Sequence, residues 1–265
     1  MVEFQRTDFY SYEDFLEIMR LLRAPGGCPW DREQTHSSIR RNFLEETYEV
    51  LDAIDHDDAS GMCEELGDVL MQVAFHAQIE AERGRFTMAN VVDGVARKLV
   101  YRHPHVFGDV QADTSQQVLA NWDVLKRREK GQRSTADAVE AVPHTLPALW
   151  RAEKIQSKTA KAGFDWTSSL QALDKLEEEV RELRAALEAG QAADAPHGIR
   201  EELGDALFIL CKIAQMSGVD PEDALHRACD KYQGRFRRVA DAADRPLNAY
   251  TEAEKIALWE QAKEN

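Results

Sequence analysis

The sequence carries one ordered set of motifs twice, and this repeat constrains the fold more than any other feature. The word Glu-Glu-x-x-Glu occupies residues 45–49 and again 178–182, and the word Glu-Leu-Gly-Asp occupies residues 65–68 and 202–205. A Lys-x-x-x-Arg pair and a Trp-x-x-x-Lys pair follow in the same order in both halves, and the offsets between partners are all 133 or 137 residues. Motifs that keep their order and spacing indicate two tandem copies of one structural unit.

Apolar residues within each copy recur at intervals of three and four, which is the spacing of one face of an amphipathic helix. The pattern holds over residues 43–54, 62–79 and 199–214, whereas the alternation typical of strands is nearly missing. We therefore predict an all-α fold of two tandem modules, each resembling a four-helix bundle that buries its apolar stripes against neighbouring helices.

The middle of the chain differs from both copies. Residues 127–147 are basic at their start, then small and polar, with two prolines and no sustained apolar stripe. We interpret this segment as a linker that contains a turn of helix. The predicted modules are then residues 1–126 and residues 148–265, with the second the expected catalytic one.

Charge and cysteine content limit the partners and the compartment. Lys and Arg number 33 against 48 Asp and Glu, a formal net charge of −15, which argues against binding to duplex nucleic acid. No segment approaches the ~18 apolar residues of a membrane helix, so we expect no membrane contact. The start lacks a secretory pattern and the four cysteines form no Cys-x-x-Cys pair, which favours a cytoplasmic protein with reduced thiols. We interpret Cys63 and Cys211 as buried packing residues.

The repeated acids are the candidate metal ligands. Residues three apart lie on the same side of a helix, so the acidic pair of each word projects together, beside the apolar stripe. Packing the stripes of two helices would bring four carboxylates face to face, where they repel unless cations neutralise them. Oxygen ligands without His or Cys suit Mg²⁺, for which Mn²⁺ can substitute. The predicted ligands are Glu179, Glu182, Glu202 and Asp205 in the second copy and Glu46, Glu49, Glu65 and Asp68 in the first.

Acidic helices also occur in proteins that bind no magnesium. Glu-rich helices can simply solvate a surface, but the recurrence of both words in register disfavours that role here. A di-iron carboxylate bundle requires Glu-x-x-His on two helices, and neither copy has a His three residues after a motif Glu.

Basic and aromatic residues also recur. Lys231 and Arg235, four apart on a predicted helix, form a cationic pair suited to phosphate oxygens, and Lys98 and Arg102 repeat it. Trp259, with its counterpart Trp122, could stack on a base or belong to the core, and the sequence leaves both open. His103 and His105 flank Pro104, which we expect to end a helix, so we interpret these histidines as structural.

With these residues assembled, the chain closely resembles the MazG nucleoside triphosphate pyrophosphohydrolases, of the all-α NTP pyrophosphatase superfamily. The resemblance covers nearly the whole chain apart from the first ~15 residues and the linker. It rests on long words that include Gly-Cys-Pro-Trp-Asp at 27–31, Leu-Glu-Glu-Thr-Tyr-Glu-Val at 44–50, Arg-His-Pro-His-Val-Phe at 102–107 and Gly-Phe-Asp-Trp at 163–166.

The resemblance implies hydrolysis of nucleoside triphosphates, ATP among them, between the α and β phosphates, with Mg²⁺ required. It assigns the acids above as metal ligands and residues 175–179, with Lys231, Arg235 and Trp259, as nucleotide-binding positions, Lys175, Glu178 and Glu179 among them. Catalysis in the family is ascribed to the C-terminal copy, although the first copy here retains every motif acid. Our candidate for orienting or deprotonating the attacking water is Glu178, while Lys231 and Arg235 would stabilise charge on the phosphates.

Several functions other than broad hydrolysis stay open. The chain could be a non-catalytic protein that senses nucleotides, or a narrower member of the superfamily specific for dUTP or phosphoribosyl-ATP, which the tandem match disfavours. Family members of this type usually form dimers, so we expect a homodimer with broad preference among nucleobases.

Overall fold

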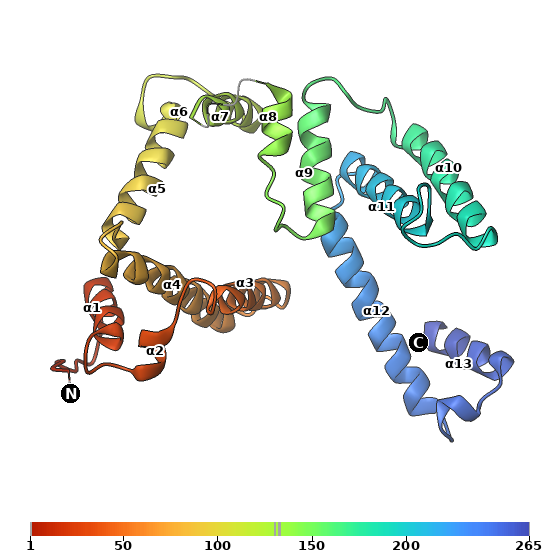
Figure 1. Ribbon diagram of the computed structural model, residues 1–265, viewed down its shortest axis with the longest axis horizontal. Coiled ribbons are helices and arrows are strands. Elements are labelled where there is room, and N and C mark those ends of the chain that lie inside the picture. The colour runs from red at the N-terminus through yellow and green to blue at the C-terminus, as the bar shows by residue number, and fades with distance from the viewer. Residues whose placement is uncertain (1, 130, 132–133, 265) are drawn as a thin grey trace. The chain divides into compact units, whose positions relative to one another are not determined.

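A computed structural model describes residues 2–129, 131 and 134–264. All regular elements in these residues are helices, which confirms the predicted all-α class. The chain divides into two compact units, Met1–Lys126 and Arg127–Asn265 (Figure 1). The first unit holds α1 (Tyr12–Arg23), α2 (Pro29–Glu33), α3 (Arg40–Asp55), α4 (Ala59–Glu82), α5 (Met88–Arg102), α6 (Pro104–Phe107) and nearly all of α7 (Ser115–Glu129). The second holds α8 (Thr135–Glu140), α9 (Ala148–Ala160), α10 (Ser169–Glu188), α11 (Ile199–Met216), α12 (Pro221–Ala242), a 3₁₀ turn (Leu247–Ala249) and α13 (Glu252–Glu264).

The repeat in the sequence is a repeat of helices. The order α1, α3, α4, α5 and α7 in the first unit corresponds to α9, α10, α11, α12 and α13 in the second. One difference is the predicted break at His103, where α5 ends and Pro104 begins the short α6, whereas α12 continues to Ala242. Proline fits the first turn of a helix because its missing N–H has no intrahelical partner there.

The predicted linker is partly helical. Within residues 127–147, α7 extends to Glu129, and α8 forms over Thr135–Glu140 and packs against α9. Ser134 caps α8 and Asp137 bonds back to the Ser134 N–H, a reciprocal capping box that explains why a six-residue helix begins here. Residues 130, 132 and 133 of the predicted linker lie outside the described residues.

The first unit has an apolar core between α1 and α4. Met19, Ile39, Ala74, Phe75 and Ile79 are its buried members. Beside it, the guanidinium of Arg23 lies 5.2 Å from the ring centre of Phe75 and pairs with Glu82 at 2.8 Å. Arg23 also donates to the backbone carbonyls of Asp31 and Gln34, so one cation fastens the segment between α1 and α3 to the core.

In the second unit, a cation on α11, the counterpart of α4, holds the equivalent segment. Lys212 of α11 stands where Phe75 stands in α4, is 1% exposed, and pairs with Asp165 at 2.5 Å and with Gln215 at 2.6 Å. A buried ammonium is tolerated only when such partners satisfy it. The cation that holds this segment therefore comes from α1 in one copy and from α11 in the other.

The apolar stripes are only partly covered within each unit, contrary to our expectation of buried stripes. One side of each helix packs on its neighbour, while leucines on the other side stay 38–56% exposed, namely Leu44, Leu51 and Leu66 in the first unit and Leu187, Leu203, Leu207 and Leu210 in the second. Cys211 is buried as predicted, but Cys63 is exposed, so that prediction is wrong. Periodicity identifies an apolar face but not the element that covers it.

Among the helices described, none is both long and apolar enough to cross a membrane.

The side chain of Lys212 is buried and that of Asp165 is partly exposed, so removing either partner should have a different effect on stability. We expect Asp165→Ala to lower the free energy of unfolding by about 3 kcal/mol, because it leaves a buried ammonium without its counter-ion. Lys212→Met should cost at most about 1 kcal/mol, because the Asp165 side chain is 30% exposed and can be hydrated. Urea unfolding of both variants measures the difference, and equal losses would contradict this description of the pair.

Candidate active site

The second copy's acids lie on two packed helices, α10 and α11. Ser168 caps α10 by accepting a hydrogen bond from the Gln171 N–H, and α11 begins directly after the connecting loop, with Gly198 as its N-cap. Glu179 and Glu182 lie on α10, and Glu202 and Asp205 lie on α11. The two helices pack side by side (Figure 1), which brings the two acidic words together.

Three of the four predicted ligands meet closely. Glu179, Glu202 and Asp205 each offer a carboxylate oxygen, and these oxygens lie within 4.8 Å of one another. Glu179 and Glu202 are buried, at 5% and 4% exposure, while Asp205 is exposed. Glu182 lies outside this triad but is close enough to act on the charge of Glu202.

Burial and neighbouring negative charge act on two members of this triad. Burial, followed by the negative charges of Glu182 and Glu179, raises the pKa of Glu202. Burial and then the charge of Glu179 likewise raise the pKa of Asp205. Both shifts mean that the folded chain disfavours the ionised acids. The donor set consists of oxygens without sulfur or nitrogen, so the triad fits a hard divalent cation.

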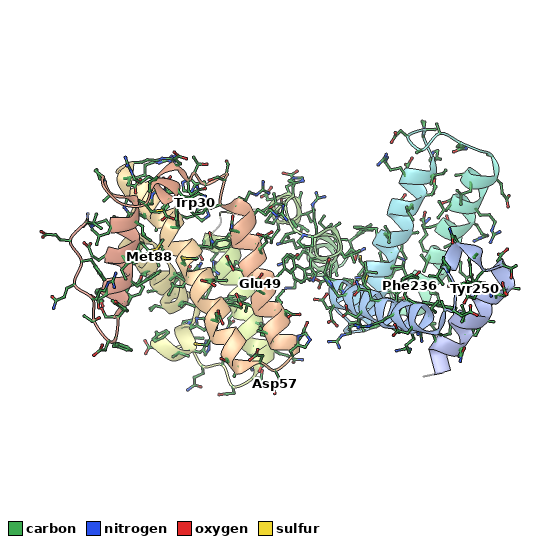
Figure 2. The ribbon with its side chains drawn as sticks, turned by 90° about the horizontal axis from the view of Figure 1, so that it is seen from below. Trp30, Glu49, Asp57, Met88, Phe236 and Tyr250 are labelled. Atoms are coloured by element: carbon green, nitrogen blue, oxygen red, sulfur yellow. The ribbon has the colours of Figure 1, made fainter. Side chains whose placement is uncertain are left out.

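The first copy forms the same kind of cluster. Glu46, Glu49 and Glu65 place carboxylate oxygens within 4.8 Å of one another, and Asp68 acts on the charge of Glu46. Burial is the largest cause of the raised pKa values of Glu46 and Glu65. A cavity of about 310 Å³ opens between α3 and α4, near the labelled Glu49 in Figure 2; its lining is Glu49, Asp52, Ala53, His56, Asp58, Gly61 and Glu65.

Lys175 is the cation nearest the second cluster. Its Nζ lies 2.8 Å from Glu179 and 2.9 Å from Glu178. These hydrogen bonds raise the pKa of Lys175, and the bond to Lys175 lowers the pKa of Glu178. The side chain of Glu178 is exposed. Because its ion pair with Lys175 lowers its pKa, Glu178 is a weaker base while that pair lasts.

The other predicted nucleotide-binding residues do not join the acids within one chain. Lys231 and Arg235 lie on α12, which begins beside α9 and α11 and leads to α13 (Figure 1). No hydrogen bond or ion pair links them to the four acids in the part of the chain that is described. Trp259 of α13 packs against Tyr232, with ring centres 5.1 Å apart, and Tyr232 stacks on Phe236 of α12, which is labelled in Figure 2.

The corresponding residues of the first copy pack more tightly. Arg102 is 8% exposed and its guanidinium lies 5.7 Å from the ring centre of Trp122, while Lys126 approaches the same ring at 5.5 Å. Arg102 therefore contributes to packing, whereas its counterpart Arg235 is only half-buried.

Two residues beside the second cluster are not among the sites predicted from the sequence. His197 precedes α11, and Glu201 precedes Glu202 in the first turn of that helix. Together with Glu202 they form another close group of possible ligands. A His four residues before a Glu is the signal that could have identified them, but the matching position of the first copy is Ser60, so the repeat does not single out this His.

A family model described as the MazG nucleotide pyrophosphohydrolase domain matches the chain twice, over residues 34–107 and 167–240. The nucleoside triphosphate pyrophosphohydrolase of Escherichia coli strain K12 is 42% identical over 252 residues, covering 94% of this chain and 95% of the relative. The nucleoside triphosphate pyrophosphohydrolase/pyrophosphatase MazG of Thermotoga maritima is 40% identical over 255 residues, covering 95% of each.

These matches define a tandem pyrophosphohydrolase, an enzyme class of hydrolases that act on acid anhydrides. The chain belongs to the MazG nucleotide pyrophosphohydrolase family. The predicted family, the tandem organisation and the enzyme class are thereby confirmed.

Neutralising one buried acid should stabilise the metal-free protein. The raised pKa values mean that stability is full below the ordinary carboxyl range and is lost as pH rises through the raised values. We expect Glu202→Gln to raise the Tm in EDTA by a few degrees at neutral pH and to reduce the extra stabilisation by Mg²⁺ or Mn²⁺.

Thermal melts from about pH 4.5 to 7.5 measure this effect, since carboxyl groups with ordinary and with raised pKa values ionise over that range. The difference in Tm between the variant and the wild type should increase as the pH rises. Glu188→Gln, at the end of α10 and outside both acidic words, is the matched control. A variant that is less stable than the wild type in EDTA at neutral pH would show that repulsion does not dominate the site.

Proposed function

We propose that the chain hydrolyses nucleoside triphosphates between the α and β phosphates, giving a monophosphate and pyrophosphate, with Mg²⁺ required and broad preference among bases. The observation that carries this proposal is the triad Glu179, Glu202 and Asp205, three carboxylates held within 4.8 Å by two packed helices. A cytoplasmic location also stays a prediction.

The proposed magnesium dependence follows from charge. A chain of net charge −15 with clustered acids repels a triphosphate unless a divalent cation stands between them. When bound by Glu179, Glu182, Glu202 and Asp205, Mg²⁺ would neutralise the phosphate oxygens and acidify a water molecule, and Mn²⁺ could replace it. The rigid helices hold the acids at fixed spacing, so little reorganisation is needed on binding.

Lys175 and Glu178 have linked roles in this proposal. Lys175 pairs with Glu178 and Glu179, and an arriving phosphate competes for its ammonium. Transfer of Lys175 to the phosphate frees Glu178, whose pKa then rises toward its ordinary value. Glu178 can then orient or deprotonate the attacking water, while Lys231 and Arg235 bind phosphate oxygens and Trp259 contacts the base.

Lys175 also supports the assignment of turnover to the second copy. The matching position in the first copy, counted from the Glu-Glu-x-x-Glu word, is Asn42, which carries no charge. Arg102 is buried against Trp122 in the first copy, so that its guanidinium is already used in packing. We propose that the first cluster binds metal but contributes little turnover.

We further propose that the active form is a homodimer. On α10, Leu173, Val180 and Leu187 recur every seven residues and are 42–56% exposed; on α11, Leu203, Leu207 and Leu210 are 44–47% exposed. Apolar side chains exposed to this extent on two packed helices are typical of an interface between proteins. A second copy would cover these residues beside the acids and could supply the cations that one chain does not bring to them.

Product analysis tests the activity and the assignment of copies. With a panel of ribo- and deoxyribonucleoside triphosphates and Mg²⁺, we expect a monophosphate and pyrophosphate from each. Glu179→Ala should lower turnover by about 100-fold or more, because loss of a ligand removes several kcal/mol of charge stabilisation. The matched variant Glu46→Ala should lower it by less than about 3-fold. Chromatography with ³¹P NMR identifies the products.

Four outcomes would oppose the proposal or one of its parts. Orthophosphate with a diphosphate would contradict α–β cleavage, and nucleotide binding without products would favour a sensor. Turnover of dUTP or phosphoribosyl-ATP alone would favour a narrower enzyme. If Glu178→Ala kept wild-type turnover while Glu179→Ala abolished it, the role of Glu178 as a base would be wrong.

Molar mass tests the homodimer. We expect Leu210→Asp to reduce the mass measured by light scattering to that of one 30.0 kDa chain, because a carboxylate cannot be buried in an apolar interface without a partner. Leu170→Asp, at the start of α10 and 71% exposed, should keep the wild-type mass. A wild-type protein that is monomeric at micromolar concentration would refute the dimer.

A further inference from the structure

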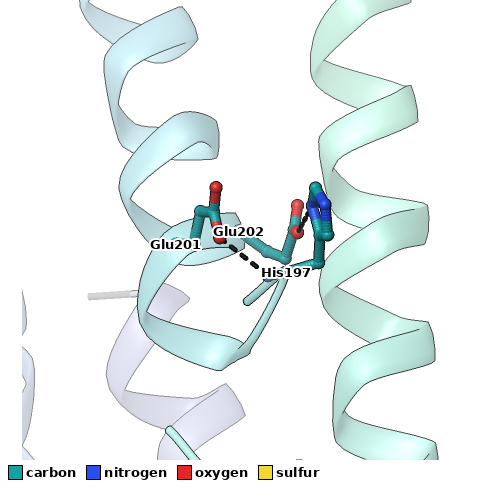
Figure 3. Close-up of side chains that lie close together, drawn as sticks. All are labelled: His197, Glu201 and Glu202. Atoms are coloured by element: carbon teal, nitrogen blue, oxygen red, sulfur yellow. Dashed lines mark hydrogen bonds and ion pairs between the residues drawn. The ribbon is translucent and has the colours of Figure 1, made fainter. Parts of the chain in front are cut away.

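The loop between α10 and α11 brings a histidine to two glutamates. Figure 3 shows the ring of His197 beside the carboxylate of Glu202, with Glu201 bonded to the His197 backbone. One ligand atom from each of His197, Glu201 and Glu202 lies within 4.8 Å of the other two. Two bonds of ~2.1 Å to a metal ion span at most ~4.2 Å, so small side-chain movements suffice to bring all three onto one ion.

The separation of His197 and Glu202 suits an intervening ion better than direct contact. The Nδ1 of His197 lies 3.7 Å from Oε1 of Glu202, which is too long for a hydrogen bond. An ion with bonds of about 2.0–2.2 Å to both atoms would have a ligand–metal–ligand angle of about 115–135° at this separation. That angle is close to those of ordinary three- and four-coordinate sites.

Glu201 is held in place for the same group. The backbone N–H of His197 donates to Oε2 of Glu201 at 2.7 Å, which leaves Oε1 and the remaining lone pairs of this carboxylate. Hydrogen bonds of this kind orient ligating carboxylates in metal sites.

The buried carboxylate of Glu202 is a separate indication of a ligand. It is 4% exposed, and no hydrogen-bond donor reaches it in the residues that are described. The carboxylates of Glu182, Glu179 and Glu201 surround it with further negative charge, and His197 is its one ion-pair partner in the residues described. A buried acceptor without donors is costly, and a cation beside His197 would satisfy it.

The start of α11 opposes a cation only weakly. A helix N-terminus carries roughly half a positive charge, and it lies beside this group. Glu201 and Glu202 alone outweigh that partial charge, and Glu179 and Glu182 add to the negative field. The balance of charge therefore attracts a divalent cation.

We propose that His197, Glu201 and Glu202 form an accessory site for a borderline divalent transition-metal ion, with Zn²⁺ the preferred occupant. Imidazole suits Zn²⁺ and other late transition-metal ions rather than Mg²⁺ or Mn²⁺, which prefer carboxylate and water ligands. The site shares Glu202 with the proposed magnesium site, but its occupancy does not require turnover.

The first copy offers a matched comparison. His56 lies in the turn after α3, where its Nδ1 bonds to the backbone carbonyl of Asp52 at 2.8 Å. In the described residues it belongs to no such group of three ligands. A variant of His56 therefore removes an imidazole from the equivalent region without touching the accessory site.

Zinc titration of the full chain, stripped with EDTA and returned to saturating Mg²⁺, tests the site. Isothermal calorimetry should show one tight Zn²⁺ per chain that His197→Asn weakens at least 10-fold and Glu201→Gln weakens about as much. Asn is chosen because His197 has a φ of +53°, a conformation that Asn tolerates. His56→Asn should stay within 2-fold of the wild type.

The outcomes separate this site from the magnesium site. Glu179→Gln should retain the tight Zn²⁺ while losing Mg²⁺-dependent stabilisation. The zinc titration can therefore be interpreted even if the proposed magnesium site is wrong. Unchanged Zn²⁺ affinity in His197→Asn would overturn the accessory site. Equal loss of Zn²⁺ in Glu179→Gln and His197→Asn would place the ion in the main cluster and would also overturn it.

Discussion

Repulsion among carboxylates on packed helices is the constraint on which the rest of this structure depends. In each copy, two helices bring acids within 4.8 Å, and burial together with like charge disfavours their ionised forms. Such an arrangement lowers stability in the absence of a cation, and the apolar packing of the same helices must offset that cost. The site is therefore a place where the fold gives up stability in exchange for cation binding.

The two copies balance their charges differently. Arg23 fastens the first connecting segment from α1, whereas Lys212 fastens the second from α11. Beside the acids, the second copy places Lys175 where the first has Asn42. Two copies of one fold can thus keep the same helices while their cationic side chains occupy different positions. The copy with a cationic side chain beside its acids is the better suited to bind phosphates.

The clustering of the acids could be predicted because it follows from two local rules. Acids three apart share a helix face, and apolar stripes force those faces together, so Glu179, Glu202 and Asp205 meet as expected. The break after Arg102 was predictable from Pro104 for an equally local reason.

Other features depend on long-range packing that periodicity does not encode. A lysine at position 212 reads as a surface residue, and only the approach of Asp165 explains its burial. The exposure of Cys63 and of the leucine stripe depends on what covers each face, and the distance of Lys231 and Arg235 from the acids depends on the course of α12. His197 could not be predicted in the same way because it joins the site through a loop rather than a helical spacing.

The most direct test of the metal-bridged site is ATP turnover by the purified protein with EDTA in excess over all divalent ions. Since the acids should bind a triphosphate only through a cation, we expect release of AMP and pyrophosphate to stop and to return when Mg²⁺ is restored. Full turnover in EDTA would contradict the cation bridge.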